Sequence, residues 1–199
     1  MDPTPRPRPR DAAASTAHLL AAARSEFAAH GFEGARIDRI SAASGFNKAL
    51  LFQRFGDKEG LYRAVIAQVA EEAVAVRAEL VTSRDDPADR AGFATMLREL
   101  AAATARFLTD HPDAARILAW ERAAGWTAFS AVHEPARDDA AGVVSGWFER
   151  AAREGWLRAG PGPARRLDLV LELVAAMLGE DRGFIADAVT AALMKQEAR

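Results

Sequence analysis

Residues 45–55, which read GFNKALLFQRF, gather three side chains that can bind anionic or polar surfaces. Lys48 and Arg54 carry cationic N–H donors, and the amide of Gln53 both donates and accepts hydrogen bonds. Such groups neutralise phosphates and read the edges of bases in a DNA groove. Helical spacing turns one side of this stretch outward, and that side consists of Lys48, Ala49, Phe52 and Gln53.

Large apolar residues make up the rest of the stretch. Phe46, Leu51 and Phe55 are expected to face inward and to anchor the short helix. An outward Phe52 and a partly outward Leu50 do not fit an ordinary solvated helix. Contact with thymine methyl groups and sugar edges would account for both.

The flanking residues predict two short helices joined by a tight turn. Residues 37–44 have apolar side chains at helical spacing, Gly45 breaks the helix, and Asn47 can cap a second one that ends near Phe55. This is the helix-turn-helix arrangement, whose second helix can enter a major groove. Lys58 lies in the first turn of the next helix, where the helix dipole does not favour a cation, so we expect it to contact a phosphate.

Helical patterns continue through the rest of the chain, and no stretch shows the alternation typical of a strand. We therefore predict an all-α fold. Residues 15–60 are expected to form a three-helix DNA-binding domain, capped at its start by Ser15 or Thr16, and residues 61–199 a helical bundle. The expected helices cover residues 15–30, 37–44, 47–55, 57–80, 88–109, 113 onward, 135–155, 164–178 and 184–194.

Composition narrows the class of protein. Half of the 199 residues are hydrophobic and 27% are charged, as in soluble globular proteins. No apolar run reaches the roughly 18 to 20 residues that cross a membrane, and the N-terminus lacks the apolar segment of a secretion signal, so we expect a cytoplasmic protein with no membrane partner. The sequence has no cysteine, which excludes disulfides, thiolate nucleophiles and zinc–thiolate sites.

Positive charge is concentrated near the N-terminus. Through Gly60 there are nine Arg or Lys residues against seven Asp or Glu residues. Arg6, Arg8 and Arg10 alternate with prolines, which favours an extended, flexible arm over residues 1–14. Such an arm can lie along phosphates or can be an inert tail, and the sequence leaves both interpretations open.

Over residues 16–69 the chain resembles the TetR family of transcriptional regulators. The resemblance is carried by FAAHGF at 27–32, IDRIS at 37–41, SGFNK at 44–48 and LFQRFGDKEGL at 51–61. It implies a homodimer whose two heads bind a palindromic double-stranded DNA operator and whose C-terminal helical domain holds a small-molecule effector that releases the DNA. Together with helical spacing, it assigns the DNA contacts to Arg36, Asn47, Lys48, Ala49, Leu50, Phe52, Gln53, Arg54 and Lys58.

Three of these residues depart from the family pattern. Phe52 stands where a tyrosine hydroxyl usually reaches a phosphate, and Arg36 stands where a threonine-like residue is common. Leu50 replaces a small residue. We therefore expect an operator that is read with more apolar contact and fewer hydrogen bonds.

The second half of the chain offers a candidate dimer interface and a candidate pocket. An apolar stripe suits the four-helix packing by which the family dimerises, although burial within one subunit is the alternative. It consists of Leu167, Val170, Leu171, Val174 and Leu178. The pocket wall is assigned to Met96, Phe107, Trp120 and Trp126, although large aromatic residues are equally typical of a core or an interface.

No catalytic, metal or cofactor site is predicted. His111, beside Pro112 and Asp113, and His133, beside Glu134, would each supply only part of a metal site, and no two histidines have metal-ligand spacing on a helix. Residues 142–146 and 160–163 lack the features of a nucleophile elbow and of a phosphate loop. The leading hypothesis is a ligand-responsive transcriptional regulator, most simply a repressor. The alternative is a helical small-molecule-binding or interaction protein with little DNA affinity; an enzyme has no catalytic constellation to support it.

Overall fold

The computed structural model describes residues 9–128 and 139–196, with the side chains of residues 15–128, 140, 142–163 and 165–196. Arg6, Arg8 and His133 lie outside the described residues. As predicted, the described chain is all-α and contains no strand beyond two isolated bridges. Its helices are α1 (Pro9–Gly34), α2 (Ile37–Ser44), α3 (Lys48–Phe55), α4 (Lys58–Thr82), α5 (Arg90–Asp110), α6 (Pro112–Ala123), α8 (Asp139–Arg153), α9 (Pro163–Ala176) and α10 (Arg182–Leu193).

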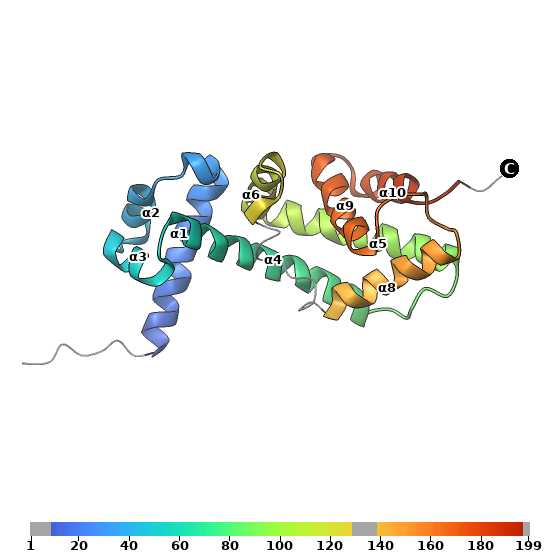
Figure 1. The fold of residues 1–199 in the computed structure, drawn as a ribbon, viewed down its shortest axis with the longest axis horizontal. Helices are drawn as coiled ribbons and strands as arrows, with labels where there is room; N and C mark the ends of the chain where they lie inside the picture. The colour runs from blue at the N-terminus through green and yellow to red at the C-terminus, as the bar shows by residue number, and fades with distance from the viewer. Residues whose placement is uncertain (1–8, 129–138, 197–199) are drawn as a thin grey trace, which may run out of the picture.

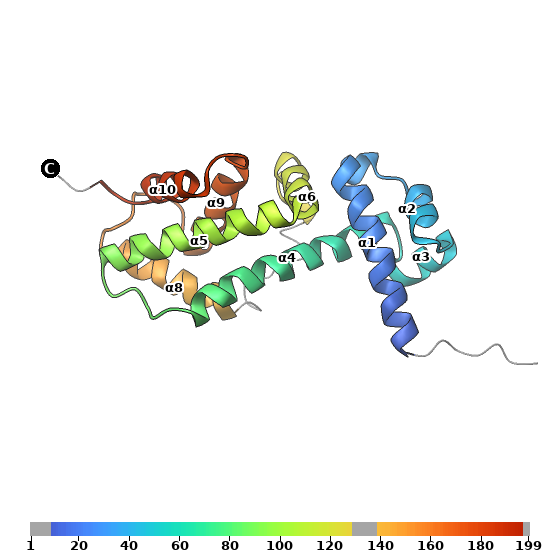
Figure 2. The same cartoon turned by 180° about the vertical axis from the view of Figure 1, so that it is seen from behind.

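The molecule is elongated, with α1, α2 and α3 at one end and α5, α8, α9 and α10 toward the other (Figure 1). The long helix α4 runs between the two ends, and α6 packs beside α1, as the reverse view also shows (Figure 2). We call α1–α3 with α4 through Glu72 the head, and the rest of α4 with the remaining helices the body. None of the helices in the described ranges is both long enough and apolar enough to cross a membrane.

Local signals set most helix boundaries close to where the sequence places them. The side chain of Asn47 accepts a hydrogen bond from the Leu50 N–H at 2.9 Å, and that of Asp57 accepts one from the Gly60 N–H at 2.7 Å. Each satisfies a donor that the first turn of a helix leaves unpaired.

Helix α1 differs from its prediction at both ends. It already runs from Pro9, so the predicted cap at Ser15 or Thr16 is wrong, and residues 9–14 of the predicted arm are helical. At the other end the helix kinks at Gly31, with φ 65° and ψ −177°, and continues to Gly34. Only glycine adopts this backbone conformation readily, so Gly31 bends the helix where the sequence predicts that it ends.

A single cluster of buried apolar residues extends through head and body. In the head, the rings of Phe27 and Tyr62 pack edge to face with their centroids 4.8 Å apart, which joins α1 to α4. In the body, Phe93 of α5 and Phe148 of α8 pack the same way at 5.4 Å. Burial of such side chains is the main favourable term that holds α2 and α3 against α1 and α4.

Candidate nucleic-acid interface

The turn between α2 and α3 is fixed by glycine and by two serine hydroxyls. Gly45 has φ 72° and ψ 5°, the left-handed conformation that commonly ends a helix. The Ser41 hydroxyl donates to the Phe46 carbonyl at 2.5 Å, and the Ser44 hydroxyl accepts from the Phe46 N–H at 3.4 Å. These bonds orient α3 relative to α2. Neither serine was predicted to have this role, although both lie in the segments that resemble the family.

Helix α3 has the two faces that its sequence predicts. Leu51 is only 2% exposed, and Phe46 and Phe55 pack partly buried against the core. Phe52 is 44% exposed, and Lys48, Ala49 and Gln53 are exposed beside it, while Leu50 is partly exposed. The head therefore presents a short helix whose polar donors surround one unburied aromatic ring, which is suited to a groove with both polar and methyl groups.

Two cations of α3 have partners within the head. Lys48 forms an ion pair with Asp38 of α2, and Arg54 donates a hydrogen bond to the Thr16 hydroxyl of α1. All four side chains lie at the surface of the head, so both contacts can exchange with phosphates or bases at little cost. Their DNA contacts remain predictions.

The Lys58 side chain is turned toward the end of α1 rather than simply outward. Its ammonium donates to the Glu33 carbonyl at 3.2 Å and lies 4.7 Å from the centroid of the Phe32 ring. This carbonyl bond and cation–π contact tie the start of α4 to the last turn of α1. An ammonium has three N–H donors, so the predicted phosphate contact would use those that Glu33 does not occupy.

Arg36 precedes α2 and has an exposed side chain. Its backbone N–H donates to the Glu26 carboxylate at 3.0 Å, which ties the start of α2 to α1. The position of Arg36 at the edge of the helix-turn-helix is consistent with a phosphate contact.

A small cavity lies between α4, α5 and α9 in the body. Its volume is about 40 Å³, and its walls are mostly apolar, with Thr104, Arg77 and Asp168 as polar groups. The apolar walls come from Ala73, Val76, Leu100, Phe107, Leu167, Val170 and Leu171. Sites for drug-sized ligands measure roughly 300 to 1,000 Å³, so an effector of that size would have to widen this cavity.

The four residues assigned to a pocket wall do not come together there. Of the four, Phe107 alone is among the lining residues of this cavity. Met96 is fully buried on the same helix, and eleven residues separate the two, which is roughly 16 Å along the axis. Trp126 follows α6 and is partly buried.

Trp120 joins the body to the head instead of lining this cavity. Its indole N–H donates to the Ala28 carbonyl of α1 at 3.2 Å. Its ring lies so close to Gly31 that a Cβ built on that glycine would be 2.9 Å from Cδ2 of the indole. The kink in α1 therefore makes room for an aromatic side chain of α6.

The predicted dimer stripe on α9 divides between two environments. Val170 and Val174 are buried within the subunit, so assigning them to a dimer interface is wrong, and the alternative of burial within one subunit holds for them. Leu167 and Leu171 line the cavity. Leu178, at the end of the stripe, is 38% exposed and remains available to a second copy.

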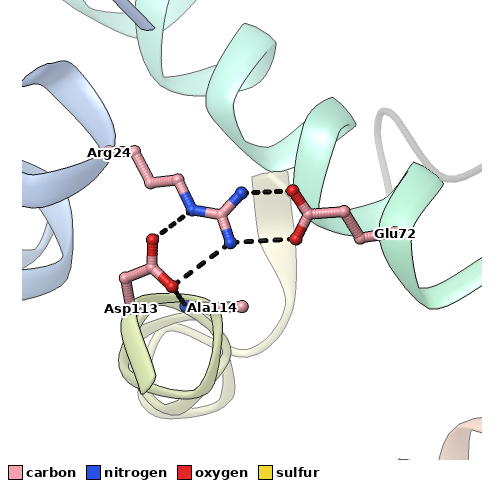
Figure 3. A network of polar contacts seen from close by, with 4 residues as sticks. All are labelled: Arg24, Glu72, Asp113 and Ala114. Atoms are coloured by element: carbon pink, nitrogen blue, oxygen red, sulfur yellow. Dashed lines mark hydrogen bonds and ion pairs between the residues drawn. The ribbon is translucent and has the colours of Figure 1, made fainter. Parts of the chain in front are cut away.

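One guanidinium connects three helices at the boundary between head and body (Figure 3). Arg24 of α1 donates from Nη1 and Nη2 to the two oxygens of Glu72 in α4 at 2.5 and 2.9 Å. Its Nε and Nη2 also approach the oxygens of Asp113 in α6 at 2.5 and 3.3 Å. We call these three residues the Arg24 junction.

Charge and burial act together at the Arg24 junction. Hydrogen bonding to Glu72, more than any other contact, raises the pKa of Arg24 above its ordinary value. Burial opposes ionisation of Asp113, but the bonds from Arg24 and from the Ala114 N–H outweigh it and lower the pKa of this carboxyl. Arg24 and Asp113 therefore both stay charged near neutral pH.

A second buried contact joins the same helices. The Tyr62 hydroxyl of α4 donates to the Glu121 carboxylate of α6 at 2.7 Å, and both side chains are buried. Burial, followed by this hydrogen bond, raises the pKa of Tyr62. Sequence reasoning found neither this pair nor the Arg24 junction, because the partners are 48 to 89 residues apart in the chain.

Within the described residues, no group of three His, Asp or Glu side chains is arranged to hold a metal ion. The candidate binding surface of the head is the outward face of α3, and the turn at Gly45 fixes the orientation of this helix relative to α2. This arrangement defines a helix-turn-helix protein of the kind that places its second helix in a DNA groove. Residues 19–65 match the family model described as bacterial regulatory proteins, tetR family. The head of this chain is therefore similar to that of tetR-family regulators.

Two curated relatives each match a little more than half of the chain. The chain is 36% identical to the HTH-type transcriptional repressor SCO4008 of Streptomyces coelicolor over 113 residues, which cover 56% of this chain and 52% of that protein. It is 33% identical to the HTH-type transcriptional regulator RutR of Escherichia coli K12 over 118 residues, which cover 59% and 52%. The chain thus spans about half the length of these relatives.

Solved structures match nearly the whole chain. A putative tetR family transcription regulator from Shewanella sp. PV-4 has a TM-score of 0.70 at 17% identity, with 92% of this chain and 99% of that chain covered. The putative transcriptional regulator SCO4942 from Streptomyces coelicolor has a TM-score of 0.61 at 23% identity, with 90% and 98% covered. At these identities the likeness shows a shared fold.

Proposed function

We propose that this protein is a sequence-specific DNA-binding transcriptional repressor, released from its operator by a small-molecule effector. The observation that carries the proposal is the outward face of α3, where Lys48 and Gln53 flank an exposed Phe52 on a helix anchored by buried Leu51. Anchored helices of this kind read base edges, while surrounding cations bind phosphates. The tetR-family head and the relatives named as transcriptional repressors support it.

The operator of this proposal is a palindrome of double-stranded DNA bound by a homodimer. One α3 helix reads only a few base pairs, and two heads related by a two-fold axis read half-sites about one helical turn apart. Leu178 and Phe184, 38% and 58% exposed near the junction of α9 and α10, are apolar enough to meet a second copy. In this proposal residues 15–60 bind DNA, and residues 61–199 dimerise and bind the effector in the cytoplasm.

The test is selection of duplex DNA from a randomised pool by the full-length protein, followed by titration of the enriched sequence at two salt concentrations. We expect a palindrome whose affinity falls steeply with salt, because phosphate contacts release counterions. Gln53→Ala should change the preferred bases, and Arg36→Ala should weaken binding to all sequences about equally. Arg116→Ala, which removes an exposed charge from α6 in the body, is the matched control. It should leave both the preferred bases and the affinity for DNA unchanged.

A helical small-molecule-binding or interaction protein with little DNA affinity is the second candidate. The pairing of Lys48 with Asp38 favours it, because a base-reading cation is already partly neutralised. A folded, dimeric protein that enriches no sequence at either salt concentration would replace the repressor proposal with this one.

A further inference from the structure

The Arg24 junction has an uneven geometry that suggests a role. We propose that it is a latch that fixes the angle of the head relative to the body, with Glu72 as its permanent arm and Asp113 as its releasable arm. The inference rests on the proposed function, because the angle matters only when two heads must meet two half-sites at one spacing.

The bond between Arg24 and Glu72 stays with the head. Helix α4 is joined to α3 by the short turn at Gly56 and Asp57, and its first turns pack against Phe27 of α1. Two parallel N–H···O bonds to one carboxylate are the strongest geometry that a guanidinium forms. Movement of the head as a unit therefore leaves this arm intact.

The bond between Arg24 and Asp113 crosses from the head to the body. The side chains of Asp113 and Glu72 are 40% and 35% exposed, whereas that of Arg24 is 12% exposed, so water reaches both acids of the junction. Asp113 also accepts a hydrogen bond from the Ala114 N–H at 2.8 Å, which would remain if Arg24 moved away. A carboxylate with a second partner and access to water loses the least when the ion pair opens.

Helix α6 makes the junction effective because the head holds it at both ends. Asp113 lies in its first turn, and Trp120, seven residues on, donates to the Ala28 carbonyl. Seven residues are roughly 10 Å along a helix, so the two contacts are far enough apart to resist rotation of α6 against α1. If the contact between Arg24 and Asp113 opens, the hydrogen bonds of Trp120 with Ala28 and of Glu121 with Tyr62 remain, and the head can rotate about that end of α6.

The cavity in the body adjoins the same end of α6. Phe107, a lining residue, lies in the last turn of α5, and its ring centroid is 5.0 Å from that of His111. Pro112 follows at once and starts α6. Widening of the cavity against Phe107 would therefore displace the segment that carries Asp113.

A distance measurement within one subunit tests the latch. The sequence has no cysteine, so Ala42→Cys on α2 and Thr95→Cys on α5 introduce the only two thiols for spin labels. Both positions are exposed. Dilution with excess unlabelled protein restricts the signal to distances within one subunit. Asp113→Asn should shift or broaden the distance distribution between head and body. Asp187→Asn, which removes the negative charge from the 2.8 Å contact with Arg98 between α5 and α10, should leave that distribution unchanged.

Operator binding gives the second readout. We expect Asp113→Asn to bind the enriched operator about tenfold more weakly, as the loss of one charge-assisted hydrogen bond predicts, and to discriminate less between half-site spacings that differ by one base pair. Arg24→Lys should behave likewise, because an ammonium cannot form the two parallel hydrogen bonds that the guanidinium makes to a carboxylate. Circular dichroism confirms folding of each variant, and Arg24→Lys serves if Asp113→Asn does not fold.

An unchanged distance distribution in both Asp113→Asn and Arg24→Lys would overturn the latch, whatever the DNA titration shows. A distribution that changes equally in Asp187→Asn would also overturn it, because the effect would then be general loosening. A wild-type protein that binds no operator defeats the proposed function instead. The distance measurement needs no DNA, so the two failures are distinguishable.

Discussion

Replacing Gly31 by alanine tests the contact that lets α6 approach the kink in α1. Gly31 has φ 65° and ψ −177°, and an added Cβ would lie 2.9 Å from Cδ2 of Trp120. The backbone conformation alone costs a non-glycine residue about 1 to 3 kcal/mol. The indole must also move, and loss of its hydrogen bond to the Ala28 carbonyl adds about 1 kcal/mol. We therefore expect the free energy of unfolding to fall by about 2 to 4 kcal/mol.

Urea unfolding followed by circular dichroism measures this loss, with protein concentration held constant because association shifts apparent stability. Gly45→Ala is the matched control. Gly45 also has a positive φ of 72°, but a Cβ there meets nothing within 4 Å, so only the left-handed conformation is penalised, by about 1 to 2 kcal/mol. Trp120→Ala should cost less in the Gly31→Ala background than in the wild type, because the two effects share one contact. Equal losses for Gly31→Ala and Gly45→Ala would refute the packing of the indole against the kink.

Two further predictions concern α4. The pKa of Tyr62 is raised above its unfolded value of about 10. The stabilisation that the neutral Tyr62 hydroxyl contributes is therefore complete below that pH. It is lost as the pH rises above it, by up to about 1.4 kcal/mol per pH unit. Urea titrations between about pH 8 and pH 11 should show this loss in the wild type and not in Tyr62→Phe, which cannot ionise beside Glu121; parallel curves would contradict the assignment. Gly60→Ala should weaken operator binding at least about tenfold, because its Cβ would lie 2.0 Å from the Phe55 carbonyl oxygen and force the end of α3 outward. Gly92→Ala is the control, because Gly92 has the equivalent position after a capping aspartate but its added Cβ would lie 3.3 Å from a carboxylate that can move. This variant should bind the operator as the wild type does. Equal binding by both variants would show that the turn before α4 tolerates a side chain.

The sequence predicts the helix-turn-helix well because its signals are local. A glycine that ends one helix, an asparagine that caps the next and the period of α3 all act within a few residues. The exposure of Phe52 and the burial of Leu51 follow from that period alone and are confirmed. Which bases and phosphates the head contacts stays a prediction, because no DNA constrains the side chains.

Contacts between distant segments were beyond sequence reasoning. A stripe such as that on α9 indicates burial but does not identify the partner, which is why Val170 and Val174 were assigned to a second subunit and lie in the core of this one. Likewise, the cost of burying Arg24 signals a partner, but two acids 48 and 89 residues away are found only once the helices are packed.

Helix α9 meets two different neighbours along its length. Leu167 and Leu171 line the cavity, whereas Leu178, just past the end of α9, is 38% exposed and belongs to the dimer interface that we propose. A molecule that enters the cavity and shifts α9 would therefore also change the dissociation constant of the dimer. By reciprocity, the same coupling makes the affinity for that molecule depend on how much protein is paired. Sensitivity to the effector would then vary with the abundance of the regulator, so a cell could retune its response by changing expression alone.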